Sequence, residues 1–336
     1  MTDLVAVVLF FGVVLYAVLG GTDFGVGFWD LTAGGADRGR RPRELMDHTL
    51  GPVWEADHVW LIYCLVVLWT AFPGAFAAIM STLYVPIGLA ALGIVLRGAG
   101  FAFREAVVRT AQQRVAGALF AVSSVLTPFF LGAVVGGIAS GRVPSVGNGA
   151  AVGSWLNPTS VLGGVLAVAV CAYLAAVTLA AAAGRRQEPD LERYFRRRGL
   201  GAAVAAGVVS LVGVAVLRAD SPRLFDRLLG PGLPLLVVSV VAGVAALVLL
   251  WRRVPPRWIR AAAVTAVGAV VLGWGVAQYP YLLGTHLSLA AGAAPRPTLL
   301  SVTVVFVAAA LLVVPSLILL YALARRGQLE VSPPGG

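Results

Sequence analysis

Long apolar runs dominate the sequence, and each is long enough to cross the hydrocarbon core of a bilayer. A helix needs about 20 residues to cross such a core. The runs are continuously apolar rather than alternating, which favours helices over the strands of a membrane barrel. We place nine spans at residues 4–22, 53–74, 76–96, 116–139, 159–183, 199–217, 232–251, 259–279 and 299–323.

The composition agrees with this interpretation, since 59% of the residues are hydrophobic and 12% are charged. An ordinary soluble domain has about twice that share of charge. The first run has no basic segment before it and no small-residue cleavage site after it, so we expect a retained first helix. The loops are too short for a further soluble domain. The sequence therefore predicts an all-α integral membrane protein, a single polytopic domain over residues 1–336.

The basic residues predict the orientation, and all 25 of them are arginine. With nine spans, 20 arginines fall on one side of the membrane and five on the other. The positive-inside rule then puts the N-terminus outside and the C-terminus in the cytoplasm. We expect the membrane to be the inner membrane of a bacterium. The net charge of +10 suits topology and anionic lipid headgroups, and the loops carry no nucleic-acid-binding module, so we expect no nucleic-acid partner.

Ionisable residues inside apolar runs are costly and often functional. Asp23 lies in the stretch GGTDFGVGFWDL. It is either a helix-end carboxylate at the membrane interface or, if the helix continues, an acid buried among helices. In the second case Gly25 and Gly27 would let another backbone approach closely.

The stretch GPVWEADHVWLIY at residues 51–63 places Glu55, Asp57 and His58 between Trp54 and Trp60. Glu55 and His58 are three residues apart and share a helix face, whereas Asp57 is expected to point elsewhere. One interpretation is an interfacial aromatic belt with polar neighbours in the headgroups. The other is that a carboxylate beside an imidazole, one to two turns into the membrane, passes protons or holds a partner chain.

Two arginines follow in LRGAGFAFR. Arg104 suits topology and lipid headgroups, whereas Arg97 is nearer the apolar run and could balance an acid in a partner chain. The histidines His48, His58 and His286 lie on separate segments without metal-binding spacing, so we expect no metal site. Haem ligation by His58 and His286 is disfavoured, because their segments start from opposite sides of the membrane.

These segments together resemble subunit II of the cytochrome bd quinol oxidases. The similar stretches follow one another at matching intervals over essentially the whole chain: GTDFGVGFWDL, GPVWEADHVWLIY, AFP, LRGAGFAFR, LNP, YPYL and TLLSVTVVFVAAALLVVPSLILLYALA.

The resemblance implies a subunit that ligates no haem and pairs with subunit I of the oxidase. Subunit I would carry two b haems and haem d, oxidise quinol and reduce O2 to water with protons taken from the cytoplasm. A structural quinone in this chain and small accessory subunits stay open.

The resemblance also assigns roles to residues. Glu55 matches a family acid of a proton path at the subunit interface, and Asp23 matches the acid of the DFGVG motif, a second candidate. Trp54, His58 and Trp60 would pack against that path or the partner. Many members read WDGN where this chain reads WEAD, so Asp57 adds a charge here.

Two other functions remain as alternatives. A proton- or cation-coupled secondary transporter would also carry intramembrane acids and helices interrupted by Gly and Pro. A purely structural scaffold subunit would tolerate neutral replacements of Glu55 and Asp23.

Overall fold

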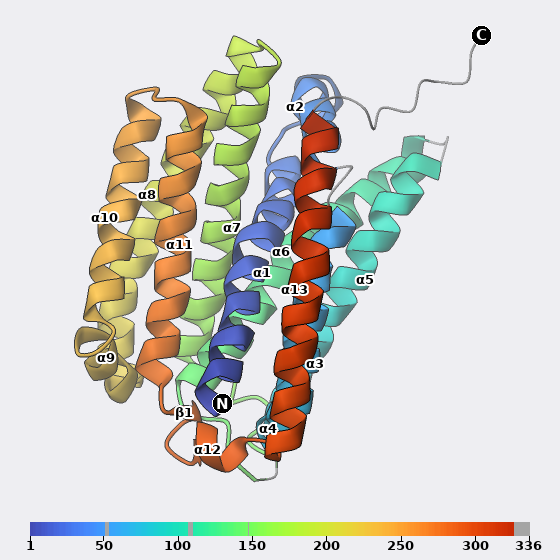
Figure 1. Ribbon diagram of the computed structural model, residues 1–336. Helices are drawn as coiled ribbons and strands as arrows, with labels where there is room; N and C mark the ends of the chain where they lie inside the picture. The colour runs from blue at the N-terminus through green and yellow to red at the C-terminus, as the bar shows by residue number, and fades with distance from the viewer. Residues whose placement is uncertain (51–53, 107–109, 147, 326–336) are drawn as a thin grey trace.

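The computed structural model describes residues 1–50, 54–106, 110–146 and 148–325, and these form long helices with a two-stranded antiparallel hairpin (Figure 1). The predicted all-α architecture is confirmed. The elements are α1 (Thr2–Leu31), α2 (Ala36–Leu50), α3 (Trp54–Ala71), α4 (Pro73–Thr82), α5 (Tyr84–Ala106), α6 (Thr110–Ala139), α7 (Pro158–Arg185), α8 (Pro189–Asp220), α9 (Pro222–Leu229), α10 (Leu233–Trp251), α11 (Pro256–Gln278), β1 (Tyr281–Leu283), β2 (Leu287–Ser288), α12 (Leu289–Gly292) and α13 (Arg296–Arg325).

The long helices stand side by side, and short elements close the bundle at both ends (Figure 1). We call one end the α2 end, where α2 and the α7–α8 and α10–α11 turns lie. We call the other the hairpin end, where the N-terminus, α4, α9, α12 and the hairpin lie. The α2 end carries the arginine-rich segments that the sequence assigns to the cytoplasm, and this orientation stays a prediction.

Seven described segments are long and apolar enough to cross a membrane, or eight if α3 and α4 count as one bent span. The predicted count of nine is not reached by this criterion. The difference is α5, because its described apolar part, Tyr84–Gly100, is too short to qualify. The chain nevertheless forms nine described helices of 18 or more residues, one for each predicted span.

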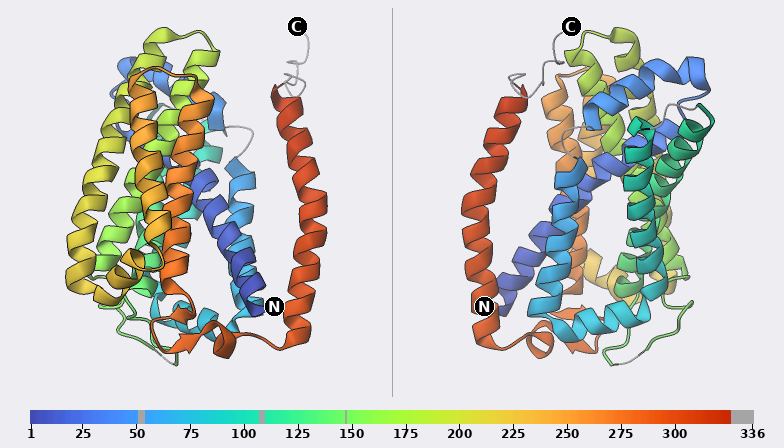
Figure 2. Two further views of the ribbon diagram at one scale, coloured as in Figure 1. Left: turned by 60° about the vertical axis from the view of Figure 1, so that its left-hand side comes forward. Right: turned by 90° about the vertical axis from the view of Figure 1, so that its right-hand side faces the viewer.

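The predicted boundary between the second and third spans was wrong. We expected spans at 53–74 and 76–96, but α3 ends at Ala71 and α4 turns away from it by 119° before α5 begins at Tyr84. Pro73 explains the first break, since proline lacks an N–H and disfavours helical geometry in the residue before it. Phe72 accordingly adopts φ −137° and ψ 60°. The segment 73–82 therefore lies across the hairpin end instead of crossing the bundle (Figure 2).

Helix α7 is the central helix of the bundle, and 61% of its apolar 18-residue stretch is buried. Small residues bring α1 against it, since a Cβ atom on Gly25 would overlap the carbonyl oxygen of Cys171. Trp29 completes the contact by donating from Nε1 to the carbonyl of Ala172 at 2.8 Å. Of the two alternatives for Asp23, the structure favours the second, because α1 continues beyond the expected end at residue 22 to Leu31. Asp23 is therefore inside a helix and not at its end.

Helix α13 stands apart from the other helices on one side of the bundle, while α8, α10 and α11 form the other side (Figure 2). Only 6% of its described apolar stretch, Arg296–Val313, is buried. Its Phe306 ring meets Phe11 of α1 and Tyr63 of α3, with ring centroids 6.3 and 5.9 Å away. Most of the described surface of α13 thus faces outward.

Candidate functional site

A buried ion pair joins α1 to α5 within the bundle. The Nη2 atom of Arg97 lies 2.6 Å from Oδ1 of Asp23, and it also donates to the Asp23 carbonyl oxygen at 3.1 Å. Asp23 and Arg97 are each only 2% exposed. The sequence argument that a buried arginine needs an acidic partner is confirmed. The expectation that this acid belongs to another chain was wrong, because Asp23 of the same chain supplies it.

Helix α6 supplies further contacts of the arginine. Arg97 Nη1 donates to the hydroxyl of Ser124, and the guanidinium lies 4.4 Å from the centre of the Phe120 ring. Phe24 of α1 lies on another side at 5.1 Å. Hydrogen bonds and ring faces together replace part of the hydration that a buried guanidinium loses.

The surroundings of Gly27 show why a glycine stands in the stretch beside Asp23. A Cβ atom at this position would overlap the Ser124 side chain and lie 3.2 Å from Arg97 Nη1. Glycine is therefore required for α1, α5 and α6 to meet around the ion pair. The predicted close approach of another backbone occurs at Gly25, whereas at Gly27 the approaching group is the Ser124 side chain of α6.

Asp57 and His58 of α3 reach the same region. Asp57 is buried at 6% exposure and is close enough to Asp23 and Arg97 to interact electrostatically with both. The His58 ring lies edge-on to Phe24, with centroids 5.8 Å apart. The prediction that Asp57 points away from the face shared by Glu55 and His58 stays a prediction, because the Glu55 side chain lies outside the described residues. Adjacent residues differ by about 100° on a helix, so Asp57 and His58 can both flank one neighbouring helix.

The other predicted site residues divide into two groups. Trp60 packs away from the ion pair, against Phe11 at 6.0 Å and Tyr63 at 5.9 Å between ring centroids. The side chains of Trp54, Glu55 and Arg104 lie outside the described residues. Their predicted roles therefore stay predictions.

Sequence reasoning missed two contributors to this cluster. Ser124 lies in the apolar run of α6, and Tyr16 lies about two helical turns before Asp23 on α1. The Tyr16 ring packs edge-on against Phe24 at 6.5 Å and His58 at 6.4 Å. Polar groups inside apolar runs are a usable signal, but one hydroxyl costs much less to bury than a charge, so the signal is weaker.

A second polar cluster lies at the hairpin end. Arg142 binds both carboxylate oxygens of Asp220, at 2.9 and 2.6 Å, and Asp220 also accepts from the Thr159 hydroxyl at 2.6 Å. The hydrogen bonds to Asp220 raise the pKa of Arg142 above its ordinary value. These contacts tie the loop after α6 to the start of α7 and the end of α8, which is a structural role.

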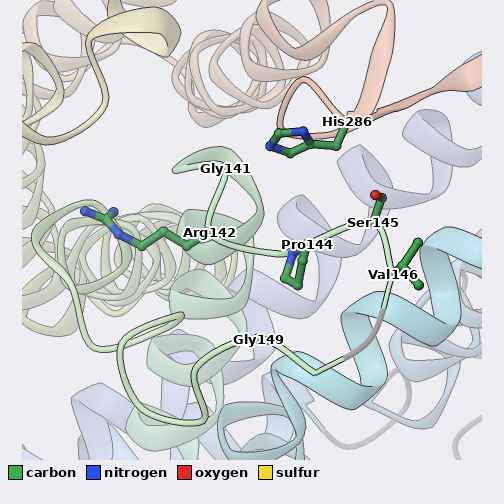
Figure 3. A pocket seen from close by; sticks show the side chains of 7 residues that line it. All are labelled: Gly141, Arg142, Pro144, Ser145, Val146, Gly149 and His286. Atoms are coloured by element: carbon green, nitrogen blue, oxygen red, sulfur yellow. The ribbon is translucent and has the colours of Figure 1, made fainter.

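A shallow hollow of about 390 Å³ lies beside this cluster (Figure 3). Arg142 directs its guanidinium away from the hollow toward Asp220, and His286 leans over the opposite edge. The lining residues are Gly141, Arg142, Pro144, Ser145, Val146, Gly149 and His286. No carboxylate or nucleophilic thiol is among these seven. The buried Asp23–Arg97 cluster is therefore the better candidate site.

The structure separates the two histidines that the haem alternative required. His286 lies in the hairpin segment. Farther along this segment, the backbone N–H of Ala294 donates to the carbonyl of Ala71 at the end of α3. His58 lies 13 residues earlier on α3, which is about 20 Å along a helix axis. One haem iron could not bind both rings. Within the described residues, no group of three His, Cys, Asp or Glu side chains gathers in a way that would hold a metal ion.

Comparison with known proteins finds similar sequences and a similar solved structure. The chain is 29% identical over 252 residues to cytochrome bd ubiquinol oxidase subunit 2 of Bacillus subtilis, covering 73% of this chain and 70% of that protein. It is 30% identical over 171 residues to cytochrome bd-I ubiquinol oxidase subunit 2 of Escherichia coli K12, covering 48% and 44%. A chain in the structure of bd oxidase from Geobacillus thermodenitrificans matches with a TM-score of 0.76 and 25% identity, covering 96% and 98%.

A family model extends this agreement to nearly every residue. The model for cytochrome bd terminal oxidase subunit II matches residues 1–324. The resemblance inferred from the sequence motifs is thereby confirmed. This chain belongs to the cytochrome bd terminal oxidase subunit II family.

Proposed function

We propose that this chain pairs with a haem-bearing subunit I in a quinol:O2 oxidoreductase and supports proton delivery from the cytoplasm for reduction of O2 to water. Family membership supports the subunit role, and the relatives in Bacillus subtilis and Escherichia coli are named as ubiquinol oxidase subunits. The two b haems and haem d would be held by subunit I. The observation that carries the proton-delivery role is the buried Asp23–Arg97 pair with Asp57 beside it.

The charges of this cluster favour proton exchange over a purely structural role. Among the described residues, Asp23 is paired with Arg97 and Asp57 interacts electrostatically with both, so these three groups carry one excess negative charge when both acids are ionised. Excess charge is costly at this depth, and binding one proton removes it. The Oδ2 atom of Asp23 is buried and accepts no hydrogen bond from the described protein groups. That oxygen is available to receive a proton.

The position of the cluster supports a route from the α2 end. Asp23 lies eight residues before the end of α1, which is about 12 Å along the helix. Asp57 lies in the first turn of α3, also near the α2 end. If that end faces the cytoplasm, protons enter over a short distance. Glu55, two residues before Asp57, is our candidate for the entrance to this route.

The exposed face of α3 and α13 is the proposed contact with subunit I. Val59, Ile62 and Trp69 of α3 are 57–62% exposed, and α13 is bare over most of its described length. Trp60 lies on this side through its packing with Phe11. Trp54 and Arg104 remain proposed partner residues. Asp57, His58 and Arg97 instead pack inside this chain and would act on the partner through it.

The test is O2 consumption by the purified complex carrying Asp23→Asn or Asp57→Asn. Each change keeps the side-chain size and removes the carboxylate, so we expect the rate with quinol to fall at least fivefold while the reduced-minus-oxidised haem spectrum is unchanged. Glu44→Gln is the matched control, because Glu44 is an exposed acid at the same end, paired with Arg40. Unchanged turnover in both Asp variants would support the scaffold alternative.

A further inference from the structure

Two groups of arginines at the α2 end differ in their partners, which the sequence does not show. The first group is neutralised by partners within the chain. Arg43 Nε lies 2.5 Å from Oδ1 of Asp30, Arg41 lies 3.1 Å from Glu188, and Arg40 lies 3.8 Å from Glu44. The contacts of Arg43 and Arg41 dock α2 onto α1 and the α7–α8 turn, whereas the Arg40–Glu44 pair lies within α2. They leave little net charge on the α2 surface.

The second group lies at the corner where α8 meets the α10–α11 turn, and we call it the α8 corner. Its members are Arg196, with Arg197 and Arg253 as charged neighbours, and Arg252 and Arg260, which are exposed at and just after the α10–α11 turn. Among the described residues, none of these five makes an ion pair or a side-chain hydrogen bond. Arg196 has Arg193, Arg197 and Arg253 as like-charged neighbours and Glu192 as the opposing acid. The corner therefore carries a concentrated positive charge.

Apolar packing underneath forces these charges together. Phe195 is fully buried on α8 and belongs to the same core cluster as Leu250 of α10 and Ile259 of α11. Gly199 lets α8 approach α10, since a Cβ atom there would lie 3.2 Å from the Leu250 side chain. With Phe195 and Gly199 directed into the core, the intervening Arg196 and Arg197 must lie at the surface. The core thus determines where the repelling guanidiniums lie.

The surroundings of the α8 corner are those of a lipid interface. Trp251 and Trp258 flank the α10–α11 turn and are 71% and 56% exposed. Exposed tryptophans concentrate at the headgroup level of membranes. Along the helices away from this corner, α8 and α10 expose apolar residues such as Leu211 and Val241. This side lies opposite α13, so the proposed contact with subunit I leaves it uncovered (Figure 2).

We propose that the α8 corner binds the headgroup of an anionic phospholipid, with the acyl chains lying along α8 and α10. Guanidinium groups bind phosphate oxygens through paired, charge-assisted hydrogen bonds. A net negative headgroup lowers the repulsion among the five unpaired arginines. A zwitterionic headgroup brings its own cation and lowers it less. The corner therefore selects anionic over zwitterionic lipid.

The test measures lipid binding to the delipidated, purified complex by native mass spectrometry. Phosphatidylglycerol and phosphatidylcholine are titrated separately against the unaltered complex and three double variants. Arg196→Gln with Arg253→Gln, and Arg252→Gln with Arg260→Gln, each remove two charges from the α8 corner. Arg40→Gln with Arg41→Gln removes two charges from α2, where both are already paired, and is the matched control.

We expect the unaltered complex to prefer phosphatidylglycerol and each α8-corner variant to bind it about tenfold or more weakly, since each basic residue near a membrane surface adds measurably to anionic lipid binding. The α2 variant should stay within about twofold of the unaltered complex, because its arginines are neutralised. Equal losses in all three variants, or no loss at the α8 corner, would overturn the proposal. Full displacement of phosphatidylglycerol by a tenfold excess of inorganic phosphate would overturn it too, because the corner would then bind free anions.

Discussion

Asp23 on α1 and Arg97 on α5 form an ion pair of 2.6 Å although 74 residues separate them in the sequence. Both are almost completely buried, and α6 closes over the arginine through Ser124 and Phe120. Three helices therefore meet at this buried charge pair.

Removing the arginine should be more damaging than removing both charges. Arg97→Gln leaves Asp23 buried without its cation, and breaking a buried pair from one side costs about 3–5 kcal/mol. The double variant Asp23→Asn with Arg97→Gln leaves no buried charge in the pair and should regain much of this stability. Thermal unfolding of the purified complex measures both. A double variant less stable than Arg97→Gln alone would contradict the ion-pair account.

Gly27 should not tolerate a methyl group. Gly27→Ala brings a Cβ atom into the Ser124 side chain and against Arg97 Nη1, so we expect poor assembly of the complex, seen as loss of co-purifying haem. Adding Ser124→Gly should restore part of the yield, because it removes the overlapping atoms. Gly207→Ala on α8 is the matched control, since a Cβ atom there has no neighbour within 4 Å. Equal yields for Gly27→Ala and this control would show that α1 and α6 have room.

Glu55 and Asp57 should differ in the substitutions that they tolerate without loss of activity. If Glu55 is the entrance to the proton route, Glu55→Asp retains a carboxylate and most activity, whereas Glu55→Gln lowers O2 consumption severalfold. Asp57 is enclosed by its neighbours, so Asp57→Glu adds a methylene to a packed position and should also lower the rate. Quinol-driven O2 consumption normalised to haem content measures all three. Full activity in Glu55→Gln would remove Glu55 from the route.

The Arg142–Asp220 pair should stabilise the hairpin end without affecting catalysis. Arg142→Gln leaves Asp220 with hydrogen bonds from Thr159 alone, at an expected cost of about 1–3 kcal/mol. The loop at 140–158 should then be cut faster by protease, with O2 consumption unchanged. Because the pKa of Arg142 is raised, its stabilising charge is present below the ordinary arginine pKa and is lost only above the raised one. No arginine-dependent loss is expected between about pH 6 and about pH 10. Equal protease resistance in both proteins would contradict this role.

The sequence predicted the class of fold and most of the residues of the site. Apolar runs give helices in a membrane because every backbone polar group must be hydrogen-bonded within the segment, and that rule acts locally. Asp23, Asp57, His58 and Arg97 were recognised because a charge within an apolar run is costly wherever the helix lies. The side chains of Glu55, Trp54 and Arg104 stay untested by the structure.

Only the tertiary structure decided which of these groups meet. Helical spacing says which residues share a face, but it does not say which helix that face will contact, so Arg97 could not be matched to Asp23 from the sequence. The bend at Pro73 and the contact of Asp57 with the site likewise depend on how α3 packs between its neighbours. The same limit separates the arginines of the α2 end. Their number follows from topology, whereas pairing in α2 and its absence at the described α8 corner follow from the distances that helix packing imposes.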